Sequence, residues 1–173
     1  MSGRAHLISA TVRRRPAPRS TGAVVVSALL LLATACSGPL TLDAPAVSGA
    51  DATACRALVD ALPEKVDGVA RVEADTGDGY GAAWGDPAIE LRCGVPVPKD
   101  FDEFSGCQTA NGVDWFVPES QQTGRPEDIV MTSVGRTVNV EVRVPATYWP
   151  PVNTMVDLGA AVKKTLRSVK PCV

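Results

Sequence analysis

Carboxylates are the side chains with which this sequence could perform acid–base chemistry. Its single histidine, His6, lies in the N-terminal segment that is predicted below to be removed as a signal peptide. Residues 75 to 77 read Asp-Thr-Gly, the tripeptide that carries the catalytic carboxylate of aspartic proteases. Such a site needs two carboxylates that share one proton. The sequence contains this tripeptide once, directly before Asp78, so a solvated turn is the stronger interpretation.

A second acidic group follows Pro98 and contains Asp100, Asp102 and Glu103. Two of these could supply the acid and base of a glycosidase, but neighbours in a Pro-bounded loop more often form a charged surface. We therefore expect no catalytic residues and no cofactor. The alternative is a hydrolase that uses carboxylates alone, which requires several of the following groups to face one another across a pocket: Asp75, Asp78, Asp86, Asp100 and Glu103.

Four of the five cysteines are predicted to form two disulfides, as an even number of cysteines does outside the cytoplasm. They are Cys55, Cys93, Cys107 and Cys172, and no Cys-x-x-Cys pair occurs among them. A four-thiolate zinc site is therefore the weaker alternative, and we expect no metal site. The residues alone leave open which of the three possible pairings forms.

The fifth cysteine, Cys36, follows a basic segment and an apolar run. Residues 1 to 20 contain five arginines and no acidic residue, and the apolar run over residues 21 to 32 is too short to span a bilayer. Residues 1 to 35 are thus predicted to be a signal peptide. The small residues before Cys36 resemble the lipobox of bacterial lipoproteins, which implies lipidation of Cys36. Cleavage after Ala35 of an ordinary secreted protein is the alternative, and export by the general secretory route is preferred to the twin-arginine route.

Removal of residues 1 to 35 from the 173 residues would leave 138, the size of one domain. The leader holds five of the 17 basic residues and none of the 19 acidic ones, so the mature chain would carry a net charge of −7. This charge argues against a nucleic-acid partner. We expect a flexible, lipidated tether over residues 36 to 50, rich in Ser, Gly, Pro and Ala, and a single domain over residues 51 to 173.

The domain is predicted to be α+β, with a small antiparallel sheet of about five strands and two helices on one face. The first helix begins with Asp51 as its cap and stops at Pro63. The second follows Pro151, with Thr154 and Asp157 as a capping box and apolar positions that continue to Val169. Strands are expected over residues 69 to 74, 89 to 93, 113 to 117, 129 to 134 and 137 to 144, the last two joined by a two-residue turn at Gly135 and Arg136.

Four aromatic residues are candidate binding residues, since such rings supply flat contact area at low entropic cost. They are Tyr80, Trp84, Tyr148 and Trp149. Packing in the core is the stronger interpretation for Trp84. Tyr148 and Trp149 lie between a strand and a helix, a position that suggests exposure.

Several stretches together resemble the domain of unknown function 3515 family, found in actinobacterial exported proteins and lipoproteins. The most specific is the string WGDPAIELRCG at residues 84 to 94; others are CRALVDALPEKVDG at 55 to 68 and VNVEVRVPATY at 138 to 148. The family supplies no catalytic residues. The resemblance implies that Cys55 pairs with Cys93, which leaves Cys107 for Cys172; Cys55 with Cys172 and Cys93 with Cys107 is the second choice.

The expected protein is a lipoprotein on the extracytoplasmic face of the cell membrane. It would be a non-catalytic binding module whose partners are the membrane, through its lipid, and an unknown envelope protein, peptide or wall component. A structural accessory subunit of a membrane complex is a further alternative, and it predicts a contiguous apolar patch on the folded surface.

Overall fold

A computed structural model describes residues 38 to 172. Within this part of the chain no helix has the length and apolar character needed to cross a membrane. The two helices are α1 (Gly49–Ala61) and α2 (Val152–Thr165), and two short 3₁₀ helices are η1 (Glu119–Gln121) and η2 (Ala146–Tyr148). The strands are β1 (Leu40–Thr41), β2 (Lys65–Val66), β3 (Val69–Val72), β4 (Ala74–Asp75), β5 (Tyr80–Trp84), β6 (Ile89–Val95), β7 (Gln108–Ala110), β8 (Val113–Phe116), β9 (Ile129–Ser133) and β10 (Asn139–Val144).

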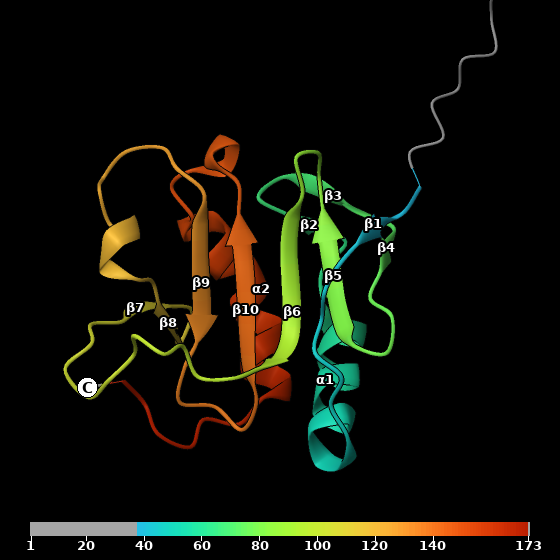
Figure 1. Cartoon of the computed structure of the whole chain (residues 1–173), viewed down its shortest axis with the longest axis horizontal. Helices are drawn as coiled ribbons and strands as arrows, with labels where there is room; N and C mark the ends of the chain where they lie inside the picture. Colours follow the sequence, from blue (N-terminus) through green and yellow to red (C-terminus); the bar gives the residue numbers. More distant parts are fainter. Residues whose placement is uncertain (1–37, 173) are drawn as a thin grey trace, which may run out of the picture. The chain divides into compact units, whose positions relative to one another are not determined.

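Eight of these strands form one antiparallel sheet in the order β2-β3-β5-β6-β10-β9-β8-β7, and β1 and β4 form a separate parallel pair (Figure 1). The mixed α and β class and the antiparallel main sheet agree with the sequence analysis, but the expected number of about five strands is too low. The strands that were not predicted are β1, β2, β4 and β7, each two or three residues long, and β5, which has five residues with the sequence YGAAW. The first four are too short to show an alternating pattern, and the small residues in the middle of β5 do not alternate with polar ones.

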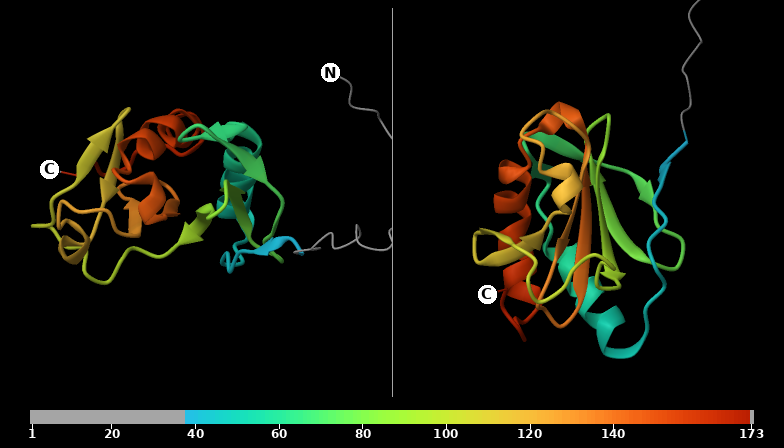
Figure 2. Two further views of the ribbon diagram at one scale, coloured as in Figure 1. Left: turned by 90° about the horizontal axis from the view of Figure 1, so that it is seen from above. Right: turned by 60° about the vertical axis from the view of Figure 1, so that its left-hand side comes forward.

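The apolar residues of the long strands alternate with polar ones and face the helices. In β6 the buried residues are Ile89, Leu91 and Cys93, and their neighbours Glu90 and Arg92 are half-buried. The register places Leu91 beside Val142 of β10, so the apolar faces of neighbouring strands coincide. Both helices lie on this side of the sheet, as Figure 2 shows. The core therefore lies between the helices and one face of the sheet.

Helix α1 begins at Gly49 with Ser48 as its N-cap, so Asp51, the predicted cap, lies in its first turn, and the helix ends before Pro63. Its buried residues Cys55 and Leu58 face the sheet. Cys55 is bonded to Cys93 of β6, with a Cα–Cα distance of 5.7 Å. The pairing implied by the family resemblance is therefore present, and it fixes α1 to a central strand.

Helix α2 lacks the predicted capping box. Thr154 is fully buried and its hydroxyl has no hydrogen-bond partner among residues 38 to 172. The carboxylate of Asp157 instead accepts a hydrogen bond from the backbone N–H of Asp67, at 2.9 Å. The helix also ends at Thr165, so Val169, predicted on its apolar face, is exposed. Asp157 thus binds the β2–β3 turn and does not cap its own helix.

The connection between β9 and β10 is not the predicted two-residue turn. Ser133 ends β9 and Asn139 begins β10, so five residues lie between the strands. The chain after α2 pairs with this loop: the carbonyl of Gly135 accepts hydrogen bonds from Val169 N at 2.8 Å and Lys170 N at 3.0 Å. Gly135 supplies the positive φ that the sequence suggested, at 71°. The conformation of Gly135 allows residues 169 and 170 to bind the loop and does not form a tight hairpin.

The second disulfide joins Cys107 to Cys172, the pairing expected to follow from the first. It links the loop between β6 and β7 to the C-terminal segment, with a Cα–Cα distance of 6.3 Å. The backbone N–H of Cys172 also donates to Asp114 of β8, at 3.0 Å. The end of the chain is therefore held against the β8 side of the sheet.

Residues 40 to 47, here called the N-terminal strap, differ from the flexible tether that the composition suggests. Leu40 pairs with Ala74, and the side chain of Leu42 is only 3% exposed. The strap crosses the face of the sheet that the helices leave open (Figure 2). It lies over glycines: a Cβ on Gly79 would stand 2.4 Å from the carbonyl oxygen of Ala44, and one on Gly94 would stand 2.4 Å from Cγ1 of Val47. The missing side chains thus make room for the strap.

Replacing Gly135 with alanine should destabilise the domain by about 2 kcal/mol or more, because a left-handed backbone and a steric clash act together. An added Cβ would lie 1.8 Å from the carbonyl oxygen of Lys170. Gly124→Ala is the matched control, since Gly124 has a similar φ of 73° and no heavy atom within 4 Å of the added Cβ. Urea unfolding of both variants measures the difference, and equal losses would contradict this account of Gly135.

Candidate functional site

The helix-free face of the sheet carries a depression of about 530 Å³ beside the N-terminal strap. The strand register places on this face the residues that alternate with the core. Arg92 of β6 lies opposite Glu141 of β10, and Glu141 lies opposite Thr132 of β9. The depression thus lies over the centre of the sheet, where neighbouring strands fix its floor.

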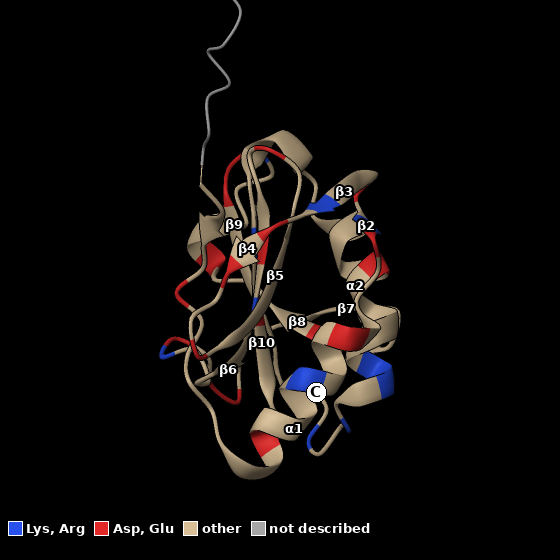
Figure 3. Ribbon diagram, turned by 90° about the vertical axis from the view of Figure 1, so that its right-hand side faces the viewer, with Lys and Arg blue, Asp and Glu red and all other residues tan. Residues whose placement is uncertain are grey.

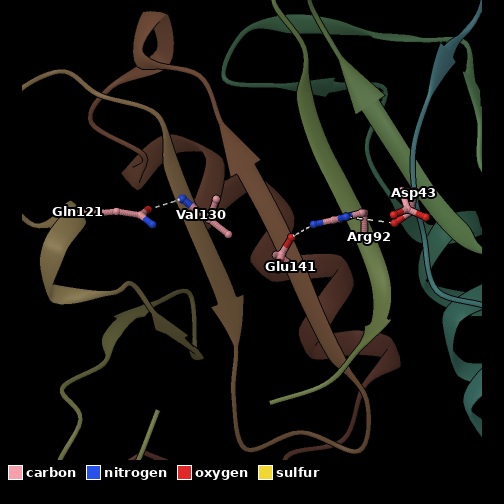
Figure 4. A network of polar contacts seen from close by, with 5 residues as sticks. All are labelled: Asp43, Arg92, Gln121, Val130 and Glu141. Atoms are coloured by element: carbon pink, nitrogen blue, oxygen red, sulfur yellow. Dashed lines mark hydrogen bonds and ion pairs between the residues drawn. The ribbon is translucent and has the colours of Figure 1, made fainter. Parts of the chain in front are cut away.

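An ion pair between Arg92 and Glu141 forms part of this floor (Figure 4). Their side chains are 33% and 21% exposed, so both charges are partly withdrawn from water. A second nitrogen of the Arg92 guanidinium donates to the backbone carbonyl of Asp43 in the strap, at 3.1 Å. Arg92 therefore connects the floor of the depression to the strap, and a guanidinium with several donors suits such a double role.

Apolar groups and main-chain segments form the walls of the depression. On one side is Pro45 of the strap, and on another is the start of the loop after β6, residues 95 to 100. On the β9 side, the side-chain oxygen of Gln121 in η1 accepts a hydrogen bond from Val130 N at 2.6 Å (Figure 4). The lining thus combines apolar surface with charged groups of both signs, as small binding sites commonly do.

Two further hollows adjoin the loop between β6 and β7. One, of about 640 Å³, is lined by acidic and aromatic residues that include Asp100, Phe104 and Glu119. The other, of about 420 Å³, lies between this loop and the C-terminal segment near Val169. Phe104 is 86% exposed. This loop therefore contributes to three concave regions, and the Cys107–Cys172 disulfide ties its end to the rest of the domain.

The four aromatic residues predicted as binding residues do not form one site. Trp84 is completely buried, and its indole N–H donates to the carbonyl of Pro63 at 2.9 Å, which agrees with packing in the core, the stronger interpretation. Tyr80 is half-buried below the guanidinium of Arg56, which lies 5.9 Å from the ring centroid. Tyr148 and Trp149 are half-buried against the core. Of the four, Trp149 lines a small hollow of about 290 Å³, which shares only Gln121 with the depression.

The candidate carboxylates are distributed over three regions of the domain. Asp75 belongs to β4 and Asp78 to the turn after it, Asp86 lies in the β5–β6 turn, and Asp100 and Glu103 lie in the loop after β6. None of the four hollows named here, all among residues 38 to 172, brings carboxylates from these three regions together. Among residues 38 to 172 there is also no group of three His, Cys, Asp or Glu residues arranged to hold a metal ion.

Two of the four charged groups with a shifted pKa among residues 38 to 172, Asp128 and Arg136, belong to loops. A hydrogen bond from Arg143 lowers the pKa of Asp128, and the backbone N–H of Ala146 adds to this effect. Burial lowers the pKa of Arg136, whose guanidinium donates to the carbonyls of Leu166 and Gly112, both at 2.6 Å. Both groups hold loops in place and neither belongs to the floor of the depression.

Sequence reasoning placed Arg92 and Glu141 correctly as the polar members of alternating strands but did not identify them as a site. The alternation shows which residues share a face of the sheet. It does not show that the two strands are neighbours or that the strap leaves this part of the face open. The lipidation predicted at Cys36 lies outside the described residues.

No curated protein and no solved structure matches this chain. A family model described as "Protein of unknown function (DUF3515)" matches residues 20 to 171. This range includes all the strands and helices described above. The chain therefore belongs to the DUF3515 family of proteins of unknown function.

Proposed function

We propose that this protein is a non-catalytic binding module, anchored to the extracytoplasmic face of the cell membrane through a lipid on Cys36. Its ligand would occupy the depression on the helix-free face of the sheet. The observation that carries this proposal is the depression itself: about 530 Å³ over the central strands, with an ion pair in the floor and apolar walls.

The ligand class that this site fits best is an extended polypeptide. The strap is a precedent on the same face, because an extended segment of this chain already lies there. The strap inserts the Leu42 side chain, which is buried, and offers the Asp43 carbonyl to Arg92. A peptide in the depression would offer the same two features, apolar side chains and main-chain carbonyls, next to Val130 and Arg92.

The cysteines support the extracytoplasmic location. All four cysteines of the described domain are in disulfides. Disulfides form and persist in oxidising compartments and are rare in the cytosol. Together with the basic and apolar leader, they favour export, and Cys36 follows the leader where a lipoprotein carries its acylated residue.

The alternatives receive less support. A carboxylate-only hydrolase needs an acid and a base on opposite sides of a substrate, whereas the candidate carboxylates lie in three separate regions. An accessory subunit predicts a contiguous apolar patch. Among the exposed large apolar side chains, Val97 and Val169 line the hollow of about 420 Å³ together, whereas Val72 of β3 and Val152 and Val156 of α2 line none of the four hollows.

Peptide binding is testable with an array of random unstructured decapeptides and the purified mature protein. We expect selective binding of some sequences, and Val130→Arg should weaken it at least about tenfold by filling the depression, a loss of about 1.4 kcal/mol. Val156→Arg is the matched control, because Val156 is an exposed valine on α2. The ligand class would be wrong if no peptide bound, if both variants bound equally, or if only wall glycan fragments bound.

The lipid anchor predicts a specific fractionation result. The wild-type protein should sediment with membranes, and Cys36→Ala should move most of it to the soluble extracytoplasmic fraction, because acyl chains supply about 0.8 kcal/mol per buried methylene. Ser37→Ala, next to the cysteine, is the control and should stay with the membranes. Membrane association that survives in Cys36→Ala would count against the anchor.

A further inference from the structure

We infer that the corner formed by β1 and β4 faces the lipid headgroups, so that this domain has one fixed orientation on the membrane. The inference rests on the proposed lipid anchor at Cys36. The β1–β4 corner does not line the proposed ligand site, and its partner is the layer of lipid headgroups.

The distance between anchor and domain is limited by covalent geometry. Leu40, the first residue of β1, is only four residues after Cys36. A fully extended chain spans at most about 3.6 Å per residue, so Leu40 cannot be more than about 14 Å from the acylated residue. A tether of 15 residues, as the composition alone suggested, would allow about 50 Å.

The short tether limits the position of the whole domain because the strap is fixed to the rest of the domain. Leu40 and Thr41 pair with Ala74 and Asp75 of β4. The next residue, Leu42, donates its backbone N–H to the Asp75 carbonyl at 2.8 Å and buries its side chain. A Cβ on Gly81 would stand 3.3 Å from Cδ1 of Leu42, so the sheet fits the strap closely at this point as well. The fixed strap therefore keeps the β1–β4 corner of the domain close to the anchor.

The charges at this corner determine how it meets the membrane. Asp43, Glu73 and Asp75 are exposed there. Figure 3 shows acidic residues around β4, whereas the basic residues of α2 lie on the helix side. Anionic headgroups would repel this corner over roughly a Debye length, about 8 Å at physiological salt. The corner thus faces the headgroups across a thin water layer and does not insert.

The loop between β6 and β7 then points away from the membrane. Figure 1 shows β1 at one end of the domain and this loop, with the C-terminal segment, at the other. The exposed Phe104 belongs to this distal loop. The depression lies on the face between the two ends. A ligand would therefore reach it from the side, without passing between the domain and the bilayer.

The orientation can be measured by energy transfer from a fluorophore on the acylated protein to an acceptor-labelled headgroup lipid. The donor is attached to Glu73→Cys or, in a separate variant, to Glu103→Cys; both glutamates are exposed. The protein is reconstituted in vesicles of phosphatidylcholine with phosphatidylglycerol. Because the tether reaches only about 14 Å, transfer from position 73 should exceed that from position 103 at least about twofold. Equal transfer, or more from position 103, would overturn the orientation.

A linker variant tests whether the short tether is the cause. Inserting 12 Gly and Ser residues after Ser37 adds a coil of roughly 20 Å and should bring the two transfer efficiencies close together. An unchanged difference would mean that adsorption of the domain, not the tether, orients it, and would overturn the inference. Intact mass separates the two proposals: absence of an acyl group at Cys36 overturns both, whereas an acylated protein with equal transfer overturns the orientation alone.

Discussion

The covalent bond between Cys55 and Cys93 determines which face of the sheet is buried. It fixes α1 to β6, a strand near the middle of the eight-stranded sheet. Both cysteines are completely buried, next to Leu58 and Leu91. Such a bridge contributes about 2 to 4 kcal/mol, a large part of a typical stability of 5 to 15 kcal/mol. With both helices on one face, the residues on the other face are free for other roles.

That free face has two parts with different uses. The strap lies close to the sheet because the glycines of β5, β6 and the turn before β5 have no side chains. The neighbouring part, over β6, β10 and β9, stays open and contains Arg92 and Glu141. Arg92 belongs to both parts, since it pairs with Glu141 and also holds the strap through the Asp43 carbonyl. Anchoring and ligand binding would thus share one face of the sheet, and a single side chain connects them.

The sequence predicted the secondary structure and its buried face correctly where local patterns determine them, as in the alternation of β6 and β10 and the apolar stripe of α2. It failed where distant segments meet. The Gly135 loop is occupied by residues 169 and 170, so it could not form the tight turn that its glycine suggests. The strap has a tether-like composition, and only the matching glycines far along the chain keep it in place. The depression needs the neighbours of β6 and β9, which no local pattern specifies.

Disulfide mapping of the native protein tests most directly the claim that helices cover one face and leave the other open. Digestion without reduction, followed by peptide mass spectrometry, should yield one linked peptide pair with Cys55 and Cys93 and a second with Cys107 and Cys172. A link from Cys55 to Cys172, or free thiols at Cys55 and Cys93, would place α1 elsewhere. The open face, the strap and the depression would then all have to be abandoned.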